Sequence, residues 1–433
     1  MKRIIDQELI DWKNSAARKP LIVRGARQVG KTWSVEDFGS RYFDSIVKVD
    51  LEKRPDLHSI FKGDLDSHRI IENLEVVTGK KIIPEHTLLF LDEIQACPRA
   101  IMSLRYFYEE IPKLHVAAAG SLLEFALGEI SVPVGRVQYL NMYPMNFYEF
   151  LCAVGSEQAA DYAAKKAAET SDAVHAQLIS HLQKYFFVGG MPECVYEYKE
   201  SGSVLDAFKV QSQLIESFKE DFSKYSGRSN KDCLSSVLLS VAQQLGDQIK
   251  YTSLSNNFSG PTNQKAFDLL SLARIIHKVP SCRQPSLPLG AVANQKKFKA
   301  IMLDIGLMQR LCNVPVDKEI VCSDLLDMYS GRLAEQFIAQ ELLVKHDSEL
   351  YYWAREERGS SAEVDFMVVD HGDIYPIEVK SGKGGSLRSL HLMLGKYPNC
   401  KNGLVYYSGQ YRALPEQKIT FLPLYYVTAA GKN

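Results

Sequence analysis

The stretch Leu21-Ile22-Val23-Arg24-Gly25-Ala26-Arg27-Gln28-Val29-Gly30-Lys31-Thr32 decides the fold of the first part of the chain, because a short apolar run leads directly into a loop bounded by two glycines. Such a loop turns successive backbone N–H groups inward, and a helix beginning near Lys31 adds the positive end of its dipole. We therefore expect a phosphate-binding loop, in which Lys31 reaches the β- and γ-phosphates of ATP and the Thr32 hydroxyl binds Mg²⁺. The residues expected to surround the nucleotide are Gly25, Ala26, Arg27, Gln28, Val29, Gly30, Lys31, Thr32 and Trp33.

The composition limits the class of protein. A chain of 433 residues with 46% hydrophobic and 24% charged residues is long enough for two or three globular domains, and it is neither disordered nor fibrous. The net charge of −1 provides no overall basic field, so any binding of nucleic acid must depend on local patches or on assembly into a ring. The eight cysteines form no Cys-x-x-Cys pair, which argues against structural zinc. No apolar run has membrane-spanning length, and we expect a cytoplasmic protein without a membrane partner.

A second apolar run, His86 to Leu91, ends in the acidic pair Asp92-Glu93. It predicts a central parallel strand whose carboxyl end emerges beside the phosphate loop. Asp92 then holds Mg²⁺, and Glu93 polarises the water that attacks the γ-phosphate, so that ATP is hydrolysed. The alternative, that both acids only solvate the end of a strand, is weaker because a complete phosphate loop precedes them.

Ser121 follows another expected buried strand, Leu114 to Ala119. It is placed either to contact the γ-phosphate or the attacking water, or to cap an expected helix over Leu122 to Leu127. The two interpretations are compatible, and both stay open here.

Three segments together resemble the AAA-type ATPases of a prokaryotic family, namely Arg24 to Thr32, Leu91-Asp92-Glu93-Ile94-Gln95 and Gly120-Ser121. In that family the motor carries a C-terminal domain of unknown function related to restriction-endonuclease-like folds. Gly135-Arg136, followed by Tyr143 to Phe150, resembles the segment that closes the family's ATPase core.

The resemblance implies that Arg136 is an arginine finger or sensor, acting on its own nucleotide or on that of a neighbouring subunit. Arg99 and Arg105 compete for this role, and an ordinary surface arginine is the alternative. We also expect a homo-oligomer, of which a hexameric ring is one form.

The middle of the chain is rich in helix-forming residues from Leu151 onward. Gly189-Gly190 resembles the family's Gly-Gly-x-Pro signature and predicts a structural bend. Helices expected over Ser235 to Leu245 and Asn263 to Ile276, with a return of the chain near residues 296–299, suggest a winged helix-turn-helix. This module either touches DNA or only packs, and the residues at the start of its second helix that would meet DNA are Thr262, Asn263, Gln264 and Lys265.

The last third carries a pattern of acids and a base that is typical of nucleases. Asp365 lies thirteen residues before Glu378, and Lys380 follows two residues later, which is the constellation of PD-(D/E)xK nucleases. Side chains alternate along a strand, so Glu378 and Lys380 share one face, and a hairpin turn at Asp370 to Asp373 brings Asp365 alongside. The two carboxylates would bind Mg²⁺, with Glu335 added from the preceding helix, and Lys380 would position or activate a water. The alternative is a surface hairpin that happens to carry Glu and Lys.

The sequence thus predicts an α/β protein with an AAA-type ATPase domain at residues 1–150, a helical and winged-helix domain at 151–320 and a restriction-endonuclease-like domain at 321–433. We expect an ATP-hydrolysing, DNA-processing motor with a metal-dependent endonuclease site that acts on branched or duplex DNA, by junction migration, by cleavage or by both. The alternative is a regulatory or signalling AAA-type ATPase whose C-terminal domain only binds DNA or a protein partner.

Overall fold

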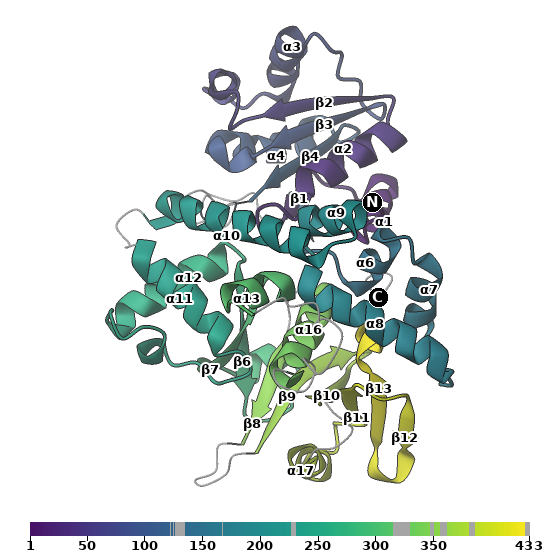
Figure 1. Ribbon diagram of the computed structural model, residues 1–433. Coiled ribbons are helices and arrows are strands. Elements are labelled where there is room, and N and C mark those ends of the chain that lie inside the picture. Colours follow the sequence, from purple (N-terminus) through teal and green to yellow (C-terminus); the bar gives the residue numbers. More distant parts are fainter. Residues whose placement is uncertain are drawn as a thin grey trace. The chain divides into compact units, whose positions relative to one another are not determined.

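The apolar runs of the first third form a five-stranded parallel sheet in the computed structural model (Figure 1). Its order is β2-β3-β4-β1-β5, and every neighbouring pair is parallel. All residues of β3 and β4 are buried, as expected for central strands covered on both faces. The strands are β1 (Leu21–Arg24), β2 (Ser45–Asp50), β3 (Thr87–Asp92), β4 (His115–Gly120) and β5 (Gln138–Asn141).

The helices of this unit alternate with the strands along the chain. The N-terminal amphipathic segment is a helix that buries Ile5, Leu9 and Trp12. The helix after the phosphate loop begins at Lys31, where Gly30 has a left-handed φ of 95° that favours glycine. The elements are α1 (Ile5–Asn14), α2 (Lys31–Tyr42), α3 (Ser67–Thr78) and α4 (Pro98–Glu110), with short 3-10 turns η1 (Pro55–Phe61) and η2 (Ile94–Ala96).

The structure describes residues 1–121, 123, 125, 135–166, 168–226, 231–314, 330–346, 350–355, 362–380 and 386–428. The chain divides into two units, residues 2–143 and residues 144–433, the latter together with Met1. The division falls close to the expected boundary at residue 150. Most of the helix expected over Leu122 to Leu127 lies outside the described residues. Within the described part, no helix has the length and apolar character needed to cross a membrane.

The second unit begins with a group of helices. The first of them is capped by Asn146. The Asn146 side chain accepts the Glu149 N–H, and the Glu149 side chain accepts the Asn146 N–H. The helices are α6 (Phe147–Ala153), α7 (Glu157–Lys165), α8 (Asp172–Val188), α9 (Pro192–Ser201), α10 (Val204–Ser226), α11 (Lys231–Gln243), α12 (Gly260–Leu272) and α13 (Ile305–Leu311), with η3 (Tyr251–Ser253) and η4 (Leu289–Val292).

The Gly189-Gly190 turn between α8 and α9 is fixed by close packing and by one buried carboxylate. Asp304 accepts hydrogen bonds from the Gly190 N–H at 2.6 Å and the Leu307 N–H at 3.0 Å. Burial raises the pKa of Asp304 to about 6, against the effect of these backbone donors. A Cβ on Gly190 would lie 2.0 Å from the carbonyl oxygen of Met145, so no other residue fits there. The turn therefore anchors the helices around it.

An eight-stranded mixed sheet joins the middle and the last third of the chain (Figure 1). Its order is β12-β13-β11-β10-β9-β8-β6-β7, and β6 pairs with β8 in parallel. The strands are β6 (Ile276–Cys282), β7 (Ala293–Met302), β8 (Tyr351–Ala354), β9 (Glu363–Asp370), β10 (Asp373–Val379), β11 (Gly403–Tyr407), β12 (Arg412–Leu414) and β13 (Ile419–Pro423). The remaining elements are α16 (Ser330–Lys345), α17 (Arg388–Lys396), η5 (Pro415–Gln417) and η6 (Leu424–Val427).

The boundary expected between residues 320 and 321 lies outside the described residues. Strands on both sides of this boundary belong to the one eight-stranded sheet. A single buried cluster includes Cys282 of β6 with Trp353, Val364 and Ile374 of later strands. The two regions therefore share a sheet and a hydrophobic core.

Candidate functional site

The phosphate loop holds its lysine on the inner side of a tight backbone path. Gly25 approaches the chain directly after β5 so closely that a Cβ would lie 2.2 Å from the Met142 carbonyl oxygen. The Lys31 ammonium is buried and donates to the carbonyl oxygens of Gly25 at 2.9 Å and Ala26 at 2.7 Å. The Lys31 ammonium thus lies inside the loop, and its contact with phosphates stays a prediction.

Thr32 and Asp92 come together at the end of β3. The Thr32 hydroxyl lies 3.1 Å from each carboxylate oxygen of Asp92. These are hard oxygen ligands of the kind that Mg²⁺ prefers, and the pair fits that ion. Burial raises the pKa of Asp92, although a neighbouring ammonium opposes the rise.

That ammonium belongs to Lys48 on β2, a residue that the sequence analysis did not single out. Its Nζ lies 3.2 Å from Asp92 Oδ2 and 3.0 Å from Glu36 Oε1. Burial lowers the pKa of Lys48, but the two carboxylates outweigh this and raise it. Lys48 lies two residues before Asp50 on β2, and Asp50 pairs with Asp92 at the ends of these neighbouring parallel strands. The order of the strands would therefore have indicated the contact between Lys48 and Asp92.

Glu93 lies among polar side chains that come from three segments. Its Oε2 accepts hydrogen bonds from Gln95 Nε2 at 2.5 Å and from the Ser121 hydroxyl at 3.4 Å. Ser121 Oγ in turn accepts from Arg27 Nε at 3.2 Å. Glu93 has a left-handed φ of 46°, which is uncommon for a residue with a side chain and typical of functional sites.

The space beside Gln95 explains why a glycine precedes Ser121. A Cβ on Gly120 would lie 2.3 Å from Gln95 Oε1. In the sequence, Gln95 belongs only to a segment that resembles a family, and the structure adds its contact with Glu93. The sequence signal for this contact was the amide side chain of Gln95, two residues after the Asp92-Glu93 pair.

The three candidate arginines have different surroundings. Arg136 is 47% exposed and, like Arg105, binds Glu109, with Nε–Oε1 distances of 2.9 and 3.0 Å. Arg99 donates to the Phe61 carbonyl at 2.7 Å. Arg136 therefore lies outside the network of Thr32, Asp92, Glu93 and Ser121. Among the other residues expected around the nucleotide, Gln28 has a left-handed φ of 63°, Val29 is buried, and Trp33 is 48% exposed.

The acids of the last third meet at the β9–β10 hairpin. His371 and Gly372 have φ values of 47° and 81°, as a two-residue hairpin loop requires. Asp365 Oδ2 accepts the Val379 N–H at 2.8 Å, and the Lys380 ammonium lies 2.6 Å from Glu378 Oε1. Burial and, next, the Asp365 carboxylate raise the pKa of Glu378 to about 7.

A lysine that the sequence analysis missed enters this cluster from β7. Lys299 Nζ lies 3.0 Å from Glu335 Oε1, 2.6 Å from Glu363 Oε1 and 3.7 Å from Asp365 Oδ1. Burial raises the pKa of Glu335 to about 7, although the Lys299 ammonium opposes the rise. Lys299 stood in the sequence as one of several lysines in a basic stretch. The apolar residues that follow it, Ala300 to Met302, were the signal that the strand becomes buried there.

These contacts decide whether the expected nuclease metal fits. Glu335, which the resemblance adds to the metal ligands, binds Lys299. Over the described residues, no three Asp, Glu, His or Cys side chains converge in a way that could hold a metal ion. The cluster as folded does not fit a divalent metal held by Glu335, Asp365 and Glu378 together.

The helix expected to meet DNA, α12, presents only part of the predicted set. Thr262, Gln264 and Lys265 are exposed, whereas Asn263 is fully buried. Asn263 Nδ2 donates to two backbone carbonyls, at 2.9 and 3.0 Å. The prediction that Asn263 contacts DNA is therefore wrong, because its amide is committed to holding the preceding turn.

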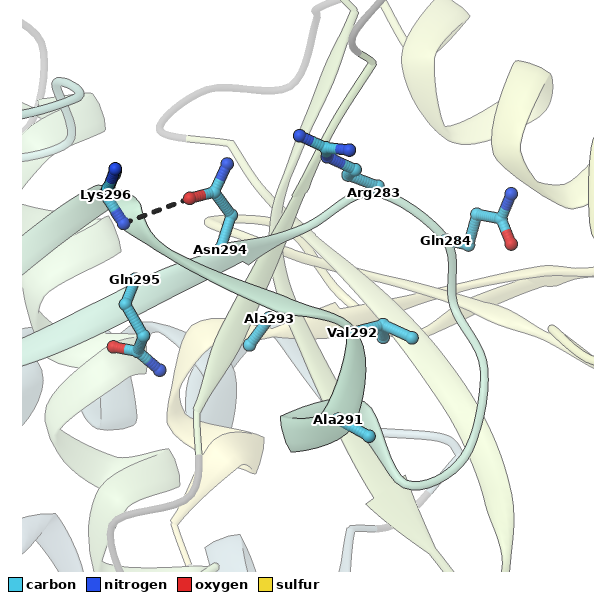
Figure 2. A pocket seen from close by; sticks show the side chains of 8 residues that line it. All are labelled: Arg283, Gln284, Ala291, Val292, Ala293, Asn294, Gln295 and Lys296. Carbon is cyan, nitrogen blue, oxygen red and sulfur yellow. Dashed lines mark hydrogen bonds between the residues drawn. The ribbon is translucent and has the colours of Figure 1, made fainter.

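The β6–β7 hairpin beside this helix is hollowed near its tip (Figure 2). The hollow has a volume of about 720 Å³, and its lining combines basic and amide side chains with the apolar residues Ala291, Val292 and Ala293. Figure 2 shows Arg283 and Gln284 on the connection after β6 and Asn294, Gln295 and Lys296 on the first part of β7. The Lys296 N–H donates to Asn294 Oδ1 at 3.0 Å, which shapes this part of the strand.

Comparison with known families finds three separate matches along the chain. Residues 17–151 match an AAA domain, residues 179–318 match a domain of unknown function (DUF8612), and residues 330–427 match a second domain of unknown function (DUF4143). No curated protein matches the chain.

Solved structures resemble the chain only distantly. A Walker-type ATPase of Pyrococcus abyssi is 14% identical, with 71% of this chain and 94% of that chain covered and a TM-score of 0.43. The RuvB Holliday junction branch migration motor of Thermotoga maritima is also 14% identical, with coverages of 64% and 89% and a TM-score of 0.30. The ORC1 protein of Aeropyrum pernix, solved in complex with DNA, is 11% identical, with coverages of 72% and 91% and a TM-score of 0.27. Likenesses with such low TM-scores carry no argument about function.

The family match and the phosphate loop point to the same segment. Residues 17–151 contain both the loop and the acidic pair at the end of β3. These residues are an AAA-type ATPase domain.

Proposed function

We propose that the chain is an ATP-driven motor that binds DNA through the middle of the chain and does not cut it at the acidic cluster of its last third. The observation that carries the ATP-hydrolysing part is the convergence of Thr32, Asp92, Glu93 and Ser121 beside the phosphate loop. In this proposal Lys31 and the loop N–H groups bind the phosphates. Mg²⁺, held by Thr32 and Asp92, would offset charge on the β- and γ-phosphates.

Glu93 orients and polarises the attacking water in this proposal, and Ser121 holds the Glu93 carboxylate in position. Removal of the loop lysine tests the proposal. We expect Lys31→Ala to abolish Mg²⁺-dependent phosphate release from ATP, while Lys113→Ala, which removes an exposed lysine of the same unit, leaves it unchanged. Equal phosphate release from both variants would refute the assignment.

An oligomer follows if Arg136 acts on a neighbouring subunit. Its half-exposed side chain, which binds Glu109 at the surface and lies near the Tyr108 ring, supports that role. Mixing two inactive variants tests it, because Lys31→Ala retains the arginine and Arg136→Ala retains an intact loop. We expect the mixture to regain ATP hydrolysis, and a mixture as inactive as its components would contradict action across subunits.

The DNA-binding part rests on the surface formed by α12 and the β6–β7 hairpin. Exposed Gln264 and Lys265 at the start of α12, and Arg283 and Lys296 around the hollow of the hairpin, offer groups that hydrogen-bond to phosphates and bases. Each phosphate contact by a lysine releases counterions and steepens the salt dependence of binding. This region also has the element order of the expected winged helix-turn-helix, which stays a prediction.

Binding of the full chain to labelled forked, four-way and linear duplexes, over a range of salt concentrations, tests this part. We expect the double variant Lys265→Ala/Lys296→Ala to reduce the slope of log K against log salt by about 2, since each lysine accounts for roughly 0.9. Lys209→Ala, which removes an exposed lysine of α10, is the matched control. A slope that is the same for all three proteins would count against the surface.

A metal-dependent endonuclease acting on branched DNA is the second candidate function. The proximity of Asp365, Glu378 and Lys380 at one hairpin favours it, while the contacts of Lys299 favour binding without cleavage. Incubation of the same three DNAs with Mg²⁺ or Mn²⁺ separates the candidates. Cleavage that disappears in Asp365→Asn would establish the endonuclease, and uncut DNA at saturating protein would exclude it.

A further inference from the structure

Lys299 occupies a site in the second unit that is built around an ammonium ion. Its side chain is only 4% exposed, although lysine is rarely buried without partners. Carboxylates from two different elements surround it, Glu335 from α16 and Glu363 and Asp365 from β9. Its Nζ also lies 5.3 Å from the centre of the Tyr352 ring, a contact that suits an ammonium.

The oxygens that a divalent metal would need are engaged by other groups. A hard divalent ion takes six or more oxygens at about 2.0–2.6 Å. Glu335 Oε1 and Glu363 Oε1 bind Lys299, Asp365 Oδ2 accepts the Val379 N–H, and Glu378 Oε1 binds Lys380. Glu378 Oε2 is the buried carboxylate oxygen of this cluster with no hydrogen-bond partner among the described residues.

We propose that Lys299 is the resident cation of this cluster, so that its ammonium takes the place of a divalent metal and the wild-type protein binds none at Asp365 and Glu378. The inference bears on the second candidate function, because a cluster that holds no metal cannot cut DNA by metal-dependent chemistry. It stands independently of whether the chain hydrolyses ATP or binds DNA.

The position of the ammonium makes the proposal reversible by one substitution. In Lys299→Met, a side chain of similar length replaces the lysine without its charge, and Glu335, Glu363 and Asp365 face one another without their common cation. Their mutual repulsion then favours uptake of a cation from solution. The variant should therefore gain the metal site that the wild type lacks.

Titration of Mn²⁺ into the nucleotide-free full chain, followed by electron paramagnetic resonance of the free ion, measures this gain. We expect Lys299→Met to bind one more Mn²⁺ than the wild type, which binds none at this cluster. The additional binding should disappear in Lys299→Met/Asp365→Asn. Lys297→Met, which removes an exposed lysine two residues away on the same strand, should behave as the wild type.

Two results would overturn the proposal. The first is Mn²⁺ binding by the wild type that Asp365→Asn removes, since the metal and Lys299 would then coexist. The second is a folded Lys299→Met variant that gains no Mn²⁺ binding, since the ammonium of the wild type would then not occupy a position that a metal can take. If Lys299→Met does not fold, thermal unfolding of the wild type with and without Mn²⁺ decides. We expect no stabilisation that depends on Asp365, and the appearance of one would refute the inference.

Discussion

Replacing Glu341 by glutamine should make the second unit more stable at neutral and alkaline pH. Glu341 lies on α16 and is almost completely buried. Its Oε1 accepts the Phe147 N–H at 2.8 Å, and its Oε2 has no hydrogen-bond partner among the described residues. Burial raises the pKa of Glu341 from 4.5 to about 8, although the Phe147 N–H and the Thr428 hydroxyl oppose the rise.

The sign of the effect follows from where the proton is bound. Between pH 4.5 and 8 the folded protein keeps the Glu341 proton while the unfolded chain loses it, so the free energy of unfolding falls as the pH rises through this range. One pKa unit corresponds to about 1.4 kcal/mol, so the wild type loses about 3 kcal/mol between pH 4.5 and 7 and about 5 kcal/mol by pH 9. Glutamine has no such proton and keeps an oxygen for the Phe147 N–H.

Native-state hydrogen exchange in a urea series measures the difference. The amides of α16 report the opening of residues 144–433, whatever the first unit does. We expect Glu341→Gln and the wild type to have similar free energies of opening at pH 4.5, and the variant to be more stable by about 3 kcal/mol at pH 7.

Glu200→Gln, which changes an exposed carboxylate on α9, is the control and should follow the wild type at every pH. The argument from burial fails if the difference between Glu341→Gln and the wild type is the same at pH 4.5 and pH 9. It also fails if the variant is less stable than the wild type at pH 9.

Three further changes have defined outcomes. Gly25→Ala should abolish binding of a fluorescent ATP analogue, because the added Cβ would lie 2.2 Å from a backbone carbonyl oxygen, and unchanged affinity would contradict this. Glu93→Gln should slow phosphate release by roughly 10²- to 10⁴-fold and leave binding of the analogue intact, whereas a parallel loss of binding would assign Glu93 to the loop instead. Asn263→Ala should lower the free energy of unfolding by about 2 kcal/mol, measured by urea unfolding, since two partly buried carbonyls lose their donor; a variant of wild-type stability would refute that structural role.

The parts of the ATPase site that the sequence predicts are those determined by local pattern. A glycine-bounded loop after an apolar run and an acidic pair after a second run are each contained in one segment, and parallel pairing brings their ends together. Lys48 could not be found in this way, because its contact with Asp92 depends on which strand lies next to β3. The contact of Gln95 with Glu93 depends on the left-handed backbone of Glu93, and a glutamate in the sequence does not indicate such a backbone.

The last third shows the same limit. The turn residues predict the hairpin, and the hairpin pairs Phe366 with Ile377, next to Asp365 and Glu378. Lys299 is distant in sequence, and it reaches the cluster only because β6 and β7 add to the same sheet as β9. A sheet assembled from distant segments has no local signature, so the cation of the cluster could not be predicted from the pattern of acids.

The pairing of β6 with β8 also limits how the chain can be divided experimentally. Their contact, Ser281 with Tyr352 and Cys282 with Trp353, covers one edge of β8. A fragment that begins at α16 would leave this edge uncovered, and the N–H and C=O groups of such an edge are a template for pairing with another chain. It would also expose Trp353, which is fully buried in the full chain. We therefore expect such a fragment to aggregate, whereas one that begins before β6 keeps the edge covered.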